Sequence, residues 1–179
     1  MTRRTALALV GLAVIGGVAA AGSADINVTP VVTEGKVVAS FTAPGAFSDD
    51  AREVVKSGLL LTFTYGVELR RPSAVWFDRT VAETTVAASV KFDSLTGIYQ
   101  VSKLRDGRVV WSERTDKEDE VGGWMTAFDQ IALDPTEALE SNADYYVRVH
   151  LKISPRRTFS FWPWGRDDGS GRKDFTFIR

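Results

Sequence analysis

The chain has 179 residues, 44% of them hydrophobic and 25% charged, and its formal net charge at pH 7 is −1. These values are close to the average of globular proteins and exclude a multi-span membrane protein, a collagen-like repeat and intrinsic disorder. The sequence contains no cysteine and one histidine. Thiol catalysis, disulfide scaffolds, iron–sulfur clusters and zinc–thiolate centres are therefore excluded, and at this length we expect one domain.

Residues 1–24 have the three-part pattern of an export signal. Arg3 and Arg4 give a positive start, residues 6–21 form an uncharged stretch of apolar residues and glycine, and small residues follow at 22–24. A leader peptidase requires small side chains at this boundary. We therefore expect a signal peptide over 1–24, one domain over 25–179 and an exported, periplasmic or otherwise extracytoplasmic protein. The alternative is an uncleaved segment that anchors the chain and contacts the membrane, although a typical span needs ~20 apolar residues.

Alternation with a period of two predicts β-strands with one buried face over most of the remaining chain. In the clearest case, Leu59–Arg71, six large side chains alternate with smaller or polar ones. The other predicted strands are Lys36–Phe41, Val81–Phe92, Tyr99–Leu104, Arg108–Ser112, Tyr145–Ile153 and a last strand with Phe175, Phe177 and Ile178. Asp106 and Gly107 separate two of these strands, and they predict a tight hairpin because Asp and Gly both tolerate a positive φ.

Two helices are expected between the strands. Ser48 is a candidate N-cap for a helix over Ala51–Ser57, which has acidic residues at its start and Gly58 at its end. A second helix is expected from Lys117 to Leu133, where Pro135 ends it. Its predicted core stripe comprises Val121, Trp124, Met125, Phe128, Ile131 and Ala132.

The order of these elements indicates a mainly β fold. Many antiparallel strands joined by short polar turns predict a β-sandwich, immunoglobulin-like or similar, with two inserted α-helices. An open β-barrel is the alternative. No βαβ alternation and no glycine-rich fingerprint occurs, which argues against a doubly wound nucleotide-binding fold.

Several short motifs, in their order and spacing, resemble a bacterial exported family catalogued as domain of unknown function 4390. They are Phe47–Arg52, Ser57–Leu59, Leu61–Tyr65, Val67–Arg71, Trp76–Arg79, Lys91–Leu95 with Tyr99, and Tyr146–Val149. The resemblance implies an export signal and one extracytoplasmic domain, with no assigned activity, cofactor or catalytic residue. Members are sometimes encoded next to membrane sensor kinases, so the resemblance also implies a possible link to envelope signalling.

Few residues in the sequence are candidates for catalysis. His150 is the only histidine, and strand alternation places it on an outward face between Arg148 and Lys152, which argues against a catalytic triad. Asp78 and Asp93 each follow an aromatic residue near a strand end, which makes them the best candidates for a glycosidase-type carboxylate pair. Their simpler interpretation is structural, since Asp93-Ser94 suggests a capped turn. We expect no metal or other cofactor.

Two segments near the C-terminus are unusual. The run Asp167–Gly171 has the composition of a calcium loop without its spacing, so a flexible hairpin turn is expected. Four aromatic residues lie within Phe159–Trp164, next to arginines. They suggest either an exposed partner-binding patch or an edge hairpin that closes one end of the core. The residues of the predicted patch are Arg156, Arg157, Phe161, Trp162, Trp164 and Arg166.

These observations favour an exported, non-enzymatic protein that binds an envelope protein. A polysaccharide hydrolase with paired carboxylates and a small-molecule or lipid carrier are the alternatives. Nucleic-acid binding is not expected, because the chain is mildly acidic and carries an export pattern.

Overall fold

The computed structural model describes residues 24–178 except 34, 75–76, 136–137 and 156–167. Within these residues the strands are β1 (Ala24–Asp25), β2 (Asn27–Thr33), β3 (Lys36–Thr42), β4 (Leu61–Arg71), β5 (Arg79–Asp93), β6 (Ile98–Arg105), β7 (Arg108–Thr115), β8 (Ala127–Leu133), β9 (Ala143–Pro155) and β10 (Gly169–Phe177). The helices are α1 (Asp49–Lys56) and α2 (Glu118–Thr126).

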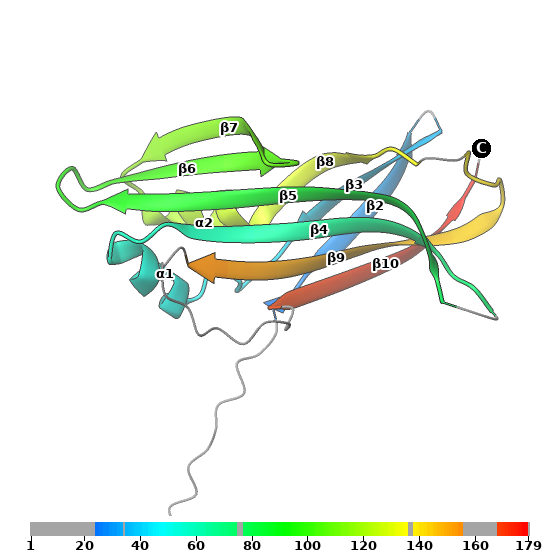
Figure 1. Ribbon diagram of the computed structural model, residues 1–179, viewed down its shortest axis with the longest axis horizontal. Helices are drawn as coiled ribbons and strands as arrows, with labels where there is room; N and C mark the ends of the chain where they lie inside the picture. Colours follow the sequence, from blue (N-terminus) through cyan, green and yellow to red (C-terminus); the bar gives the residue numbers. More distant parts are fainter. Residues whose placement is uncertain (1–23, 34, 75–76, 136–137, 156–167, 179) are drawn as a thin grey trace, which may run out of the picture.

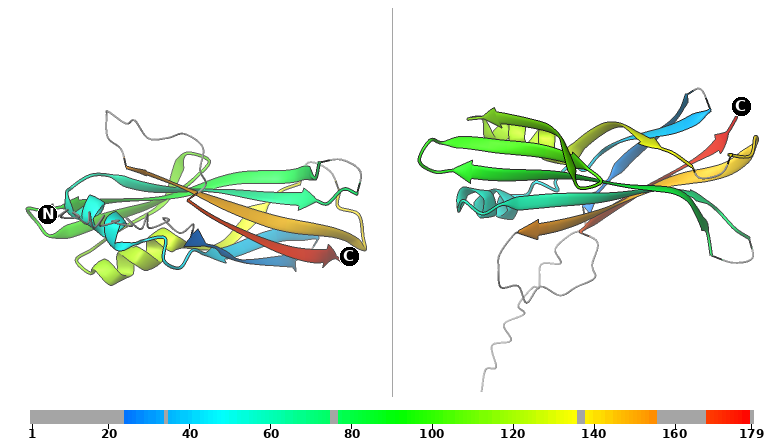
Figure 2. Two further views of the ribbon diagram at one scale, coloured as in Figure 1. Left: turned by 90° about the horizontal axis from the view of Figure 1, so that it is seen from below. Right: turned by 45° about the horizontal axis from the view of Figure 1, so that its top comes forward.

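The strands form two sheets that pack as two layers. The large sheet has the order β1-β10-β9-β4-β5-β6-β7, and the small sheet has the order β2-β3-β8. All neighbours are antiparallel except β1 and β10. Seen from below, the small sheet and both helices lie on one side of the large sheet (Figure 2). The predicted mainly β sandwich with two helices is confirmed, and the sheets do not close into a barrel.

The core lies between the layers and follows the predicted alternation. In β4, Phe63 and Tyr65 are fully buried, and the Tyr65 ring lies 5.0 Å from Phe41 of the small sheet. The Tyr65 hydroxyl donates to the backbone carbonyl of Met125, at 2.9 Å, which ties α2 to the large sheet. Burial of the apolar faces of both sheets supplies the main stabilisation of such a fold.

The cap of α1 and the turn between β6 and β7 form as the sequence predicts. The Ser48 side chain accepts a hydrogen bond from the backbone N–H of Ala51, and Gly58, after the helix, has φ +79°. Asp106 and Gly107 have φ values of 47° and 78°, as a two-residue hairpin requires. Local chemistry therefore fixes both features.

The second predicted helix is wrong in its C-terminal half. It ends at Thr126, and Phe128, Ile131 and Ala132 belong to β8, which pairs with β3. The register of this pair shifts, and Gln130 adopts a φ of 53°. This bulge places Phe128 and Ile131, three positions apart, on the same buried face and so imitates the spacing of a helix.

The N-terminal and C-terminal strands also differ from expectation. β2 was not predicted, since its Pro30 interrupts the apolar pattern. Gly169–Gly171, expected in a flexible turn, lie in β10, where they pair with β9. Glycine at 169 and 171 allows the chain at Ala24–Ile26 to approach closely. A Cβ on Gly169 would lie 2.6 Å from the Ala24 carbonyl oxygen. Ala24, the last residue of the expected leader, donates its N–H to the Asp168 carbonyl at 2.8 Å, so the described fold begins there.

Candidate interaction surface

The connection between β4 and β5 bends away from β9 and β10 at one end of the molecule (Figure 1). Asp78 fixes its base. One carboxylate oxygen accepts a hydrogen bond from the Tyr146 hydroxyl of β9 at 2.7 Å, and the other accepts from the backbone N–H of Ser73 at 3.1 Å. Arg70 Nη2 donates to the Asp78 carbonyl at 2.7 Å. Both sides of the connection are therefore tied to each other and to β9. We refer to Arg70, Ser73, Asp78 and Tyr146 as the hairpin clamp.

The electrostatics of the hairpin clamp favour an ionised Asp78 and a neutral Tyr146. The hydrogen bond from Tyr146, followed by that from Ser73, lowers the pKa of Asp78 below its ordinary value of 3.8. Burial, followed by the bond to Asp78, raises the pKa of Tyr146. The Arg172 guanidinium of β10 lies over the Tyr146 ring, 3.6 Å from its centre, in a cation–π contact.

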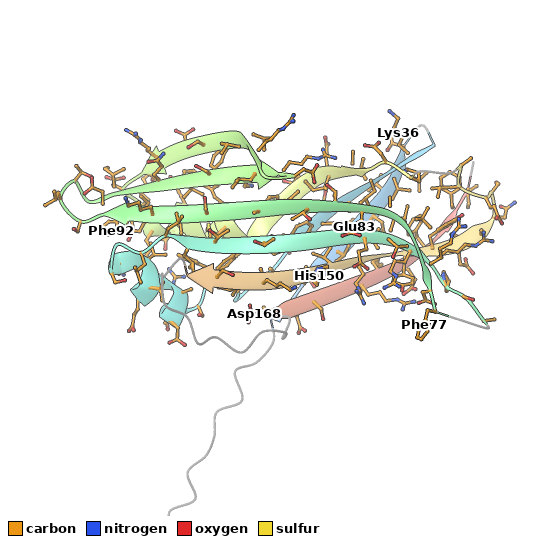
Figure 3. All side chains as sticks on the ribbon, in the orientation of Figure 1. Lys36, Phe77, Glu83, Phe92, His150 and Asp168 are labelled. Carbon is orange, nitrogen blue, oxygen red and sulfur yellow. The ribbon has the colours of Figure 1, made fainter. Side chains whose placement is uncertain are left out.

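Phe77, immediately before Asp78, is 92% exposed. Figure 3 shows its side chain projecting from the end of the connection, away from both sheets. An exposed aromatic ring on a backbone that is fixed in place loses little conformational entropy when a partner covers it. Aromatic side chains are also enriched in protein interfaces relative to the rest of the surface.

A second polar group extends from the clamp along the outer face of the large sheet. Glu68 of β4, with its side chain 13% exposed, accepts from Arg70 at 3.4 Å and from Arg148 at 3.3 Å. His150 lies outward, as predicted, but its ring packs over Gly66, where any Cβ would meet the imidazole. Its Nδ1 is 4.0 Å from Glu68. The neighbouring cations of His150 are visible in the sequence, whereas this carboxylate comes from the adjacent strand β4.

Asp78 and Asp93 do not form a carboxylate pair. They flank or end the 15-residue strand β5, which separates them by on the order of 45 Å, whereas glycosidase carboxylates lie roughly 5–10 Å apart. The Asp93 side chain accepts from the backbone N–H of Leu95 at 2.9 Å. This bond is the largest cause of the lowered pKa of Asp93. It also caps the turn after β5, as the sequence predicts.

The residues of the predicted aromatic patch lie outside the part of the chain that the structure describes. Arg156, Arg157, Phe161, Trp162, Trp164 and Arg166 lie outside the described residues, as does Asp167. Among the residues that the structure describes, no group of three or more acidic or histidine side chains is arranged to hold a metal ion. No helix in the same part of the chain is both long and apolar enough to cross a membrane.

Asp78 is a candidate from the sequence, but the residues that give it a role are not. Tyr146 and Arg172 come from strands 68 and 94 positions further along the chain, and nothing local indicates that they meet Asp78. The exposed Phe77 was noticed only as the aromatic neighbour of Asp78. One signal was available, since Tyr145-Tyr146 breaks the alternation of β9 with two aromatic residues on opposite faces.

The fold and this surface define a two-sheet β-sandwich that presents an aromatic hairpin at one end. The chain belongs to the family described as Domain of unknown function (DUF4390), which matches residues 23–157. The resemblance found in the sequence motifs is thereby confirmed. No functionally described protein and no solved structure matches the chain.

Proposed function

We propose that the protein is an exported, non-enzymatic interaction module of the cell envelope and that the β4–β5 connection contacts its protein partner. The observation that carries the proposal is Phe77, 92% exposed on a backbone fixed by Asp78. A pre-organised aromatic ring of this kind loses little conformational entropy when a partner covers it, which suits a binding surface.

Export is proposed from the pattern of residues 1–24 alone. A membrane sensor kinase is one partner to consider, because the family resemblance drawn from the sequence motifs carries that expectation. Among the described residues nothing favours the hydrolase or carrier alternatives. Asp78 and Asp93 are at opposite ends of β5, and the buried side chains between the sheets form one continuous cluster.

The most direct test uses two exposed residues at opposite ends of β5. Leu95, in the turn after β5, is 96% exposed and provides a matched control for Phe77. The photoreactive p-benzoylphenylalanine replaces either residue in the full chain, and the producing cells are irradiated. We expect a covalent adduct of discrete mass from position 77 and none from position 95. The same adducts from both positions, or none from either, would contradict the proposal.

The predicted patch over Arg156–Arg166 stays a second candidate for partner contact. Replacing Trp162 and Trp164 by alanine together should weaken recovery of the partner captured through position 77 without changing cooperative unfolding. If the double variant unfolds, these rings belong to the core and the patch is wrong.

A further inference from the structure

The edges of the two sheets differ in how they are protected against the addition of another strand. Exposed edges with regular backbone are templates for pairing, and proteins block them with prolines, charges or covering groups. β2 has Pro30, which lacks an N–H group. At the β8 edge, Lys103 donates to the Ala127 carbonyl at 2.8 Å and Arg105 donates to the Ala132 carbonyl at 2.9 Å. A strand added at either of these two edges would therefore find some of the backbone groups missing or already bonded.

The edge at β10 is protected as well. β1 pairs with its first two residues, and the following stretch exposes Arg172, Lys173 and Asp174. Charged side chains on an edge oppose strand addition, because an incoming strand would have to remove them from water.

β7 forms the remaining edge, and its charged residues, Arg108, Glu113 and Arg114, leave the stretch Val109–Ser112 between them uncharged. It lies at the border of the large sheet in Figure 1, and no described strand pairs with its outer side. The strand contains no proline or lysine, and Val109 and Val110 are 61% and 64% exposed. A bulge lies at Val110, since Lys103 pairs with Trp111 while Leu104 pairs with Val109. From Trp111 to Thr115 the register is regular.

We propose that β7 pairs with β7 of a second copy of this chain, antiparallel and centred on Ser112. A two-fold axis through this pair places each Ser112 opposite its counterpart, Val110 opposite Arg114 of the second copy, and Trp111 opposite Glu113 of the second copy. The aliphatic stem of Arg114 then covers the exposed Val110. The two large sheets become one continuous sheet, and the backbone groups of both edges are paired.

Charge selects this register from its neighbours. Centring the pair on Glu113 or on Arg114 opposes two identical charges at the axis, which destabilises a cross-strand pair. Centring it on Trp111 brings Arg108 against Arg114 of the second copy, and centring it on Val110 puts the bulge itself at the axis. The Ser112 register opposes no like charges and keeps the bulge at Val110 away from the axis.

The absence of cysteine from the sequence allows a clean crosslinking test. Directly opposite residues in antiparallel strands have Cα atoms roughly 4.5–5.5 Å apart, within the range of a disulfide. Full-chain Ser112→Cys should therefore form a covalent dimer rapidly under a mild oxidant. Val110→Cys is the register control, since its two copies would be on the order of 13 Å apart. Val31→Cys, on the blocked β2 edge and 46% exposed at the native valine, is the edge control.

A charge exchange tests the same pairing without a covalent bond. Ser112→Lys and Ser112→Glu each place two like charges at the axis, so each variant alone should sediment as a monomer at concentrations where the wild-type chain forms a dimer. An equal mixture of the two should recover the dimer. A wild-type chain that stays monomeric at every concentration, a dimer that neither variant weakens, or Val110→Cys crosslinking as fast as Ser112→Cys would overturn the proposal.

Discussion

The dipeptide Phe-Asp occurs at both ends of strand β5, as Phe77-Asp78 just before it and as Phe92-Asp93 at its last residues, and the two dipeptides have different environments. At the far end, Phe92 packs against Tyr99 with ring centres 4.5 Å apart, and Asp93 caps its own turn. At the near end, Phe77 is almost fully exposed, and Asp78 bonds to β9 through Tyr146. The dipeptide alone therefore does not determine the role of its residues. The partners supplied by distant strands decide whether the ring is buried or presented.

The largest expected difference between the two ends is in stability. Phe92→Ala should lower the free energy of unfolding by about 1.5 kcal/mol, because a half-buried ring loses its contact with Tyr99. Phe77→Ala should change it by less than about 0.5 kcal/mol, since the ring is in water. Urea unfolding of both variants measures the contrast. Equal losses would mean that Phe77 packs against the protein and is not a presented side chain.

A smaller effect is expected from opening the clamp. Tyr146→Phe removes the hydroxyl that Asp78 accepts from, a net contribution of about 1 kcal/mol, so limited proteolysis within residues 72–78 should be about fivefold faster. Tyr145→Phe is the matched control. It removes the neighbouring hydroxyl, which accepts from the Glu140 N–H, and should leave cleavage at 72–78 as in the wild type. Unchanged cleavage in Tyr146→Phe would show that the clamp does not hold the connection.

The smallest expected effects are on the stability of the two ends of β5 at acidic pH. The pKa values of Asp78 and Asp93 are both lowered from 3.8, for Asp78 chiefly by Tyr146 and for Asp93 chiefly by the Leu95 N–H. Each ionised carboxylate therefore stabilises the fold above pH 3.8, and this contribution is lost as the pH falls through the lowered pKa. Asp78→Asn should remove the acid sensitivity of proteolysis at 72–78, whereas Asp93→Asn should leave it intact. If both variants behave alike, the acid response is not local to the clamp.

The predictable parts of the molecule are those fixed by neighbouring residues. Ser48 caps α1, and Asp106-Gly107 forms its hairpin, because the groups that satisfy the backbone lie within a few positions. The alternation of β4 was equally clear, since one of its faces packs on the core throughout.

Residues 127–133 were mistaken for helix because a bulge at Gln130 gives a strand the spacing of a helix, and only pairing with β3 resolves the ambiguity. The hairpin clamp was missed for a related reason. Asp78 was visible as a candidate, but Tyr146 reaches it across the sheet, and the order of the strands in the sheet was not available from the sequence.

Amide hydrogen exchange at Ser73 and Leu95 tests the contrast between the two ends most directly. Each amide donates to an aspartate carboxylate, Ser73 to Asp78 at 3.1 Å and Leu95 to Asp93 at 2.9 Å. Both should be protected in the wild-type protein, and Tyr146→Phe should speed exchange at Ser73 while leaving Leu95 unchanged. Exchange at Ser73 that does not respond to Tyr146→Phe, or an equal response at Leu95, would contradict the claim that β9 holds Phe77 in its exposed position.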